Sequence, residues 1–138
     1  MRSSSRAVER ALREAAADHR VDRDRVYVTG HSMGGRGALY AGYKMPERFA
    51  AVVSLGPVSP ITAWAGKLAK IPLRLFHGSK DQFLPLKEVE ELIRAIEAAG
   101  GSPEFTVLER DHYILDVYDR PELYEWLARQ KRKPAADK

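Results

Sequence analysis

The sequence predicts an α/β fold in which about four parallel strands are flanked by helices. Short apolar, β-branched runs alternate four times with helical segments along the 138 residues. Three of these runs end at a glycine, namely Gly30, Gly56 and Gly78. Strands separated by helices pair in parallel with right-handed crossovers. A chain of this length suits one domain, and we predict it over residues 1–130, followed by a polar, basic tail at 131–138.

The four strands are predicted where aliphatic and β-branched residues cluster between turn residues. They are expected at residues 25–29, 50–55, 73–77 and 105–108. In an open parallel sheet the chemistry lies beyond the carboxyl ends of the strands. The segments that follow these strands are therefore the places to search for functional residues.

Helices are predicted between the strands from apolar residues at helical spacing. The first spans about residues 5–19, and the second spans 34–44 and stops at Met45-Pro46. Residues 58–70 are irregular apart from a short helix around Trp64. A further amphipathic helix opens at Leu86 and stops at Gly100. The last begins near Pro121.

Composition excludes several classes of function. The chain has no cysteine, which removes disulfides, thiolate metal sites and cysteine nucleophiles. Its net charge is +4, but acidic residues alternate with basic ones, so we expect no nucleic-acid partner. No run reaches the roughly 18 apolar residues of a membrane span, and no secretory signal is evident, which favours a cytoplasmic location. We expect no metal site and no organic cofactor.

Gly30-His31-Ser32-Met33-Gly34 matches the G-x-S-x-G nucleophile elbow between a predicted strand and a predicted helix. Such a turn is so tight that side chains two residues before and after Ser32 would clash. It also directs the start of the next helix at the site, so the amide of Met33 faces the position of an oxyanion. Gly34, Gly35, Gly37 and Ala38 let that helix approach the sheet. Ser32 is the predicted nucleophile.

A serine hydroxyl needs an adjacent base at neutral pH. His112 follows the fourth strand and fits that role, whereas His31 would point away from the serine and His19 and His77 suit packing or structural bonds. The base in turn needs an acid. Asp81 follows the third strand and is preferred over Asp111 and Asp116. The chain order Ser, Asp, His is that of α/β-hydrolases.

These motifs give the chain a specific resemblance to the dienelactone hydrolase, carboxylesterase and predicted-peptidase branch of the α/β-hydrolases. The elbow at residues 27–35, the segment around Asp81 at residues 71–85 and the C-terminal end at residues 112–130 are each similar to that branch. The resemblance covers nearly the whole chain, but only the family's C-terminal half. The family fold has about eight strands, and the loop after its third strand normally gives the second oxyanion donor. Loss of one donor typically lowers turnover about 100- to 1000-fold.

The expected activity is hydrolysis of small or short-chain carboxylic esters through an acyl-enzyme. Trp64, Phe83 and Tyr113 are expected to line the substrate pocket, although ordinary packing explains them equally well. Peptide or amide hydrolysis by the same triad and a non-catalytic binding module stay open as alternatives. The chain could be a minimal esterase, a fragment or an inactive remnant. The strand before Ser32 would be an exposed edge, so we expect a homodimer formed through it.

Overall fold

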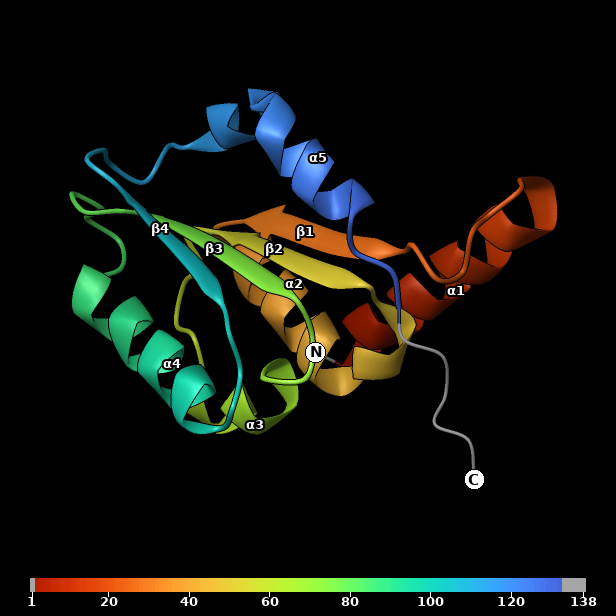
Figure 1. Ribbon diagram of the computed structural model, residues 1–138, viewed down its shortest axis with the longest axis horizontal. Helices are drawn as coiled ribbons and strands as arrows, with labels where there is room; N and C mark the ends of the chain where they lie inside the picture. The colour runs from red at the N-terminus through yellow and green to blue at the C-terminus, as the bar shows by residue number, and fades with distance from the viewer. Residues whose placement is uncertain (1, 133–138) are drawn as a thin grey trace.

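The computed structural model describes residues 2–132 and shows a three-layer α/β fold (Figure 1). Its sheet contains β1 (Tyr27–His31), β2 (Ala51–Leu55), β3 (Leu73–Gly78) and β4 (Glu104–Leu108). The strands lie side by side in sequence order, and every neighbouring pair is parallel. The predicted fold class is confirmed. β1 extends two residues beyond its predicted end because Gly30 and His31 still pair with Ser54 and Leu55.

The helices alternate with the strands and end close to the predicted positions. They are α1 (Arg2–Asp18), α2 (Met33–Lys44), α3 (Ala65–Leu68), α4 (Leu86–Ala98) and α5 (Pro121–Ala128). Three 3-10 helices complete the chain, namely η1 (Pro46–Arg48), η2 (Thr62–Trp64) and η3 (Leu115–Asp119). Of these, η1 and η3 have no counterpart in the prediction, because three to five residues are too few to show a helical period.

The two faces of the sheet bury alternate residues of each strand. Val52, Leu73 and Leu75 pack against α2, α3 and α4 on one face. Ala51, Val53 and Phe76 pack on the other face, against residues of η3 and α5. This period of two is the signature of a strand covered on both sides. Helices on both faces hold the strands so that all their carboxyl ends open at one edge.

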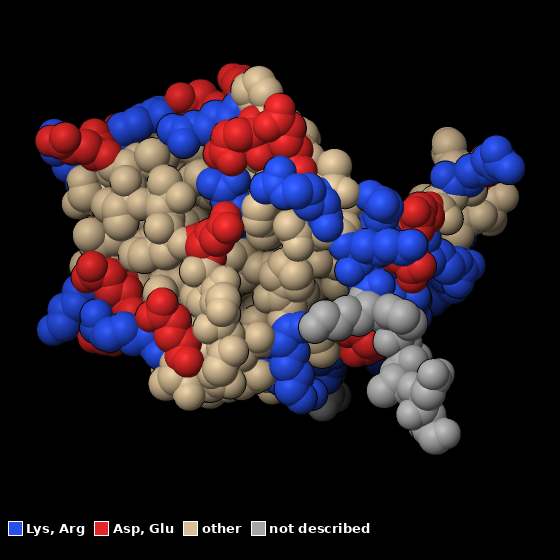
Figure 2. Space-filling model, viewed as in Figure 1, with Lys and Arg blue, Asp and Glu red and all other residues tan. Residues whose placement is uncertain are grey.

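The first helix has much less contact with the sheet. It packs on α2 and runs out to one side of the molecule in Figure 1. No side chain of residues 5–18 is fully buried. Basic side chains gather over this region in Figure 2, where Arg48 bonds to Glu9 at 2.9 Å. Basic and acidic groups therefore neighbour one another here.

The predicted tail begins inside the described chain and continues beyond it. Arg132 bonds to the Asp24 carboxylate at 3.2 Å and to the Glu47 carbonyl at 2.8 Å, so this residue is held against the domain. Residues 133–138 lie outside the described part of the chain. Within residues 2–132, no helix is long and apolar enough to cross a bilayer.

Candidate active site

The nucleophile elbow joins β1 to α2 at the carboxyl edge of the sheet. Ser32 has φ 63° and ψ −117°, a conformation that residues with a Cβ rarely adopt. A side chain at Gly30 would overlap the backbone of Gly34, so glycine is required there. An added Cβ at Gly34 would meet nothing, which contradicts the expected clash on that side. The strain at Ser32 lifts its hydroxyl above the sheet.

The close approach of α2 to the sheet depends on two of its buried glycines, Gly35 and Gly42, and a Cβ at Gly42 would lie 2.7 Å from the side chain of Val52 in β2. A Cβ at Gly35 would lie 2.7 Å from the Leu55 carbonyl oxygen, and the buried Ser54 hydroxyl donates to the Gly35 carbonyl at 2.8 Å. Gly37, by contrast, faces open space. Of the four small residues predicted to permit this packing, Gly35 and the buried Ala38 lie at the contact.

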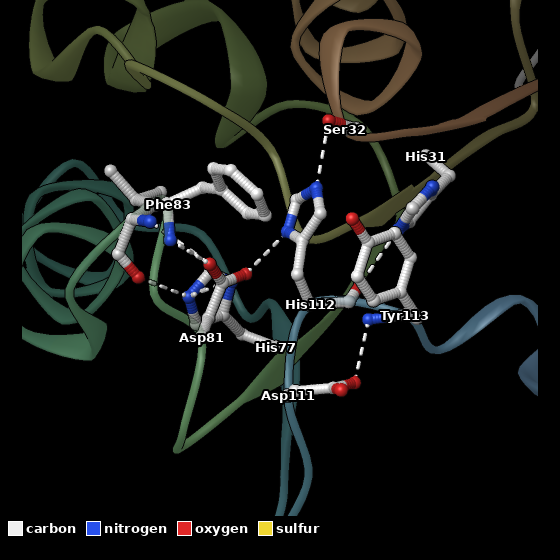
Figure 3. Close-up of polar contacts among 9 residues, drawn as sticks. His31, Ser32, His77, Asp81, Phe83, Asp111, His112 and Tyr113 are labelled. Atoms are coloured by element: carbon white, nitrogen blue, oxygen red, sulfur yellow. Dashed lines mark hydrogen bonds and ion pairs between the residues drawn. The ribbon is translucent and has the colours of Figure 1, made fainter.

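Three predicted residues from three different loops meet above this edge (Figure 3). The Ser32 hydroxyl lies 2.8 Å from His112 Nε2, and His112 Nδ1 lies 2.6 Å from Asp81 Oδ2. An ionised carboxylate only accepts hydrogen bonds, so His112 Nδ1 carries the proton and donates it to Asp81. His112 Nε2 is then an acceptor, and the Ser32 hydroxyl donates to it. This arrangement can remove the serine proton during attack.

The acid loop (residues 79–85, between β3 and α4) keeps Asp81 ionised. Burial raises the pKa of the Asp81 carboxyl, but the hydrogen bond from His112 and those from the amides of Leu84 and Phe83 outweigh it. The pKa of Asp81 therefore lies below its ordinary value of 3.8. Oδ1 accepts the two amides at 2.9 and 2.8 Å, which leaves Oδ2 free for His112. The side chain is completely buried.

The base loop (residues 109–114, between β4 and η3) holds His112, which is 4% exposed. Arg110 binds Asp116 through two bonds of 2.6 and 2.7 Å and also donates to the Tyr113 carbonyl at 2.9 Å. The Asp111 carboxylate accepts the Tyr113 amide at 2.9 Å. Asp111 and Asp116, the two carboxylates rejected as the acid of the triad, therefore brace the loop that carries the base.

An open cavity of about 340 Å³ surrounds the serine. It is lined by residues of the elbow, the loop after β2, the acid loop and the base loop, namely His31, Ser32, Val58, Phe83, His112 and Tyr113. Phe83 and Tyr113, predicted to line a pocket, are 57% and 60% exposed and stand with their rings against His112. Val58 was not anticipated, because its loop carries no motif.

Trp64, the third predicted pocket residue, lies elsewhere. It is buried in the core cluster, stacks on Tyr43 at 5.4 Å and contacts Tyr40 edge to face. It does not line the cavity at Ser32. A large aromatic residue in an irregular segment is compatible with either a core or a pocket position, and Trp64 occupies a core position.

The predicted oxyanion donor stands at the start of α2. Met33 is the first residue of that helix, where amides have no acceptor within the helix. The residue is 69% exposed. Among residues 2–132 no group of three or more His, Asp or Glu side chains is arranged to hold a metal ion.

Known proteins similar to this chain were found by sequence and by structure. The sequence pattern of the phospholipase/carboxylesterase family matches residues 1–117. The acyl-protein thioesterase 1 homolog 2 of Dictyostelium discoideum is 32% identical over 91 residues, which cover 63% of this chain and 40% of that protein. This chain thus spans well under half the length of that curated relative.

Two solved structures extend the comparison. A thermostable esterase is 26% identical with a TM-score of 0.79, and the match covers 91% of this chain and 36% of the esterase. The acylaminoacyl peptidase of Pyrococcus horikoshii is 16% identical with a TM-score of 0.74, over 92% of this chain and 27% of that one. At 16% identity the likeness to the peptidase concerns the fold alone.

Proposed function

The chain belongs to the phospholipase/carboxylesterase family of α/β-hydrolases, and from that premise we propose that it hydrolyses carboxylic esters through an acyl-enzyme on Ser32. One observation carries the proposal: the continuous line of hydrogen bonds from Ser32 through His112 to Asp81. Each of these residues comes from a separate loop. Their convergence at hydrogen-bond distance is the arrangement that nucleophilic acyl transfer requires.

The reaction follows from the direction of these bonds. Ser32 Oγ attacks the ester carbonyl carbon as its proton passes to His112 Nε2, and Asp81 stabilises the imidazolium formed. The amide of Met33 donates to the oxyanion of the tetrahedral intermediate. Its collapse expels the alcohol, which takes the proton from His112. Water then attacks the acyl-enzyme by the same sequence and releases the acid.

The cavity favours a small, uncharged acyl group. Apart from the two histidines, its lining consists of Ser32 and the uncharged side chains of Val58, Phe83 and Tyr113. Within residues 2–132, no lysine or arginine lines it to pair with an anionic substrate. A volume of about 340 Å³ is at the low end for small-molecule sites. Short-chain acyl or aromatic esters fit these properties best.

The test compares turnover of p-nitrophenyl acetate, p-nitrophenyl butyrate and acetyl p-nitroanilide with covalent labelling by a p-nitrophenyl phosphonate. We expect ester turnover to exceed anilide turnover, and we expect both labelling and turnover to disappear in Ser32→Ala. Ser102→Ala changes an exposed serine outside the site and is the matched control. A folded protein that neither turns over the esters nor takes the label would exclude the proposal and favour a binding module.

We further propose that a second copy of the chain covers β1. Alternate residues of a strand bond to the same neighbour, and the Val26 carbonyl accepts from Ala50 on the β2 side. The peptide groups of Tyr27, Thr29 and His31 therefore face outward. Two such edges related by a two-fold axis would pair antiparallel, which would bring the start of β1 in one copy beside the elbow of the other. A monomeric mass by light scattering across micromolar concentrations would rule this out.

A further inference from the structure

The base loop is fixed by three side-chain hydrogen bonds to its main chain. Two of them are local, because Arg110 and Asp111 bind the carbonyl and amide of Tyr113 within the same loop. The third comes from the elbow: His31 Nε2 lies 2.8 Å from the His112 carbonyl oxygen, across 81 positions of sequence. Of the three, this bond alone joins the base to the element that carries the nucleophile (Figure 3).

The direction of the bond follows from its partners. A carbonyl oxygen only accepts, so His31 Nε2 carries a proton and donates it. The His31 ring also lies against the His112 ring, with 4.8 Å between their centres. With its Nε2 proton engaged by a carbonyl, His31 is not arranged to accept the proton of Ser32. Its contribution is one of position.

We propose that His31 is a positioning residue that ties the main chain of the base to the residue before the nucleophile and so sets the distance between Ser32 and His112. Asp81 bonds the His112 ring at Nδ1, and the rings of Phe83 and Tyr113 stand against it. The His31 bond fixes the backbone from which the same side chain extends. The contacts of the ring and the His31 bond to the main chain act on different parts of the residue, and together they set where His112 Nε2 lies.

The expected size of the effect is large for so small a contact. Displacement of a catalytic group by about 1 Å can lower the rate about 100-fold. Loss of the His31 bond should therefore lower kcat about 10- to 100-fold. Because His31 also lines the cavity at Ser32, the effect on kcat is the one that tests the positioning role. The inference rests on the proposed hydrolase function for this rate effect, but its structural content can be measured without turnover.

The experiment uses the full chain with three substitutions. His31→Phe keeps a ring and removes the donor, and His31→Gln keeps an amide donor at nearly the place of Nε2. His19→Phe changes an exposed histidine outside the site and is the control. If His31→Phe lowers the melting temperature, His31→Ala replaces it, because alanine removes the donor without adding bulk.

Two readouts are compared for each variant. One is the pseudo-first-order rate of labelling by the p-nitrophenyl phosphonate, together with kcat and KM for p-nitrophenyl acetate. The other is the proton resonance of His112 Nδ1–H in the bond to Asp81, observed with ¹⁵N-labelled histidine. We expect His31→Phe to slow labelling about 10- to 100-fold and to broaden the resonance, whereas His31→Gln restores both to within about threefold of wild type.

The outcomes separate the two proposals. Labelling and resonance unchanged in His31→Phe would overturn the positioning role, as would a His31→Gln variant as impaired as His31→Phe. If the folded wild-type chain neither hydrolyses the ester nor takes the label, the proposed hydrolase function fails. The resonance alone then decides the inference: broadening in His31→Phe but not in His31→Gln supports it, and any other pattern overturns it.

Discussion

Replacing the serine of the elbow by glycine should stabilise this protein relative to replacing it by alanine. Ser32 has φ 63° and ψ −117°, and a side-chain-bearing residue held in such a conformation costs about 1–3 kcal/mol. Glycine adopts it without that penalty. Alanine keeps the strain. Both variants lose the hydrogen bond to His112, so its contribution cancels when they are compared with each other.

The magnitude can be worked from these opposing effects. Strain relief of about 1–3 kcal/mol is offset by about 0.4–1 kcal/mol for the greater freedom of glycine in the unfolded chain. The Ser32→Gly variant should therefore exceed Ser32→Ala by about 1 kcal/mol in free energy of unfolding. For a chain of this size that corresponds to a melting temperature roughly 4 °C higher.

The assay is urea denaturation followed by circular dichroism, with a matched pair at Glu91. That residue is exposed in the middle of α4, where glycine should be about 1 kcal/mol less stable than alanine. The two positions should thus show opposite signs. If alanine is favoured at position 32 by the same margin as at position 91, the backbone of the elbow is not strained and the reasoning is refuted.

Three more substitutions test other parts of the site, and a fourth, at Gly37, is a control outside it. Asp81→Asn presents an amide to His112 Nδ1 and favours the wrong tautomer, so ester turnover should fall about 10⁴-fold. The ionised Asp81 carboxylate stabilises the fold at pH values above its ordinary pKa of 3.8, and this stabilisation is lost as the pH falls through its lowered pKa. Urea denaturation from pH 7 to pH 3 should therefore show a smaller loss of unfolding free energy in Asp81→Asn than in the wild type. Gly78→Ala places a Cβ against two backbone carbonyls of the base loop and should lower the free energy of unfolding by about 1–3 kcal/mol. Gly37→Ala places a Cβ in open space, and in the same denaturation assay it should raise the free energy of unfolding by up to about 1 kcal/mol. Arg110→Lys keeps the positive charge but removes the guanidinium group that bonds Asp116 and the Tyr113 carbonyl together. The loop that carries His112 is then less well held, so kcat should fall up to about tenfold while the melting temperature stays nearly constant.

Much of the fold was predictable because its signals are local. Apolar runs of four to six residues alternate with helical periods, and strands in this pattern pair in parallel. The elbow at Ser32 is a contiguous motif, and His112 and Asp81 each follow a strand whose end the sheet brings to the same edge. The place of each loop then follows from the parallel arrangement of the strands, with no knowledge of individual contacts.

What the sequence could not supply depends on contacts between distant residues. His31 bonds to a backbone carbonyl 81 positions away, and a backbone acceptor leaves no trace in residue identity. Trp64 is apolar and aromatic whether it lines a cavity or a core, and only its stacking on Tyr43 distinguishes them. Position 35 requires glycine and position 34 does not, because position 35 lies on the side of α2 that meets the sheet. The sequence does not show which side that is.

The sequential order of the strands has a consequence for how this protein forms as it is synthesised. Because each new strand adds beside the one before it, the sheet can grow from β1 to β4 as the chain emerges, without inserting a strand between two already paired. Ser32 belongs to the first unit of this sequence, and His112 follows the last. Ser32 therefore lacks its hydrogen-bond partner His112 until β4 and the loop after it have formed. On the proposed function, this strand order delays the reactivity of Ser32 until the four described strands have assembled.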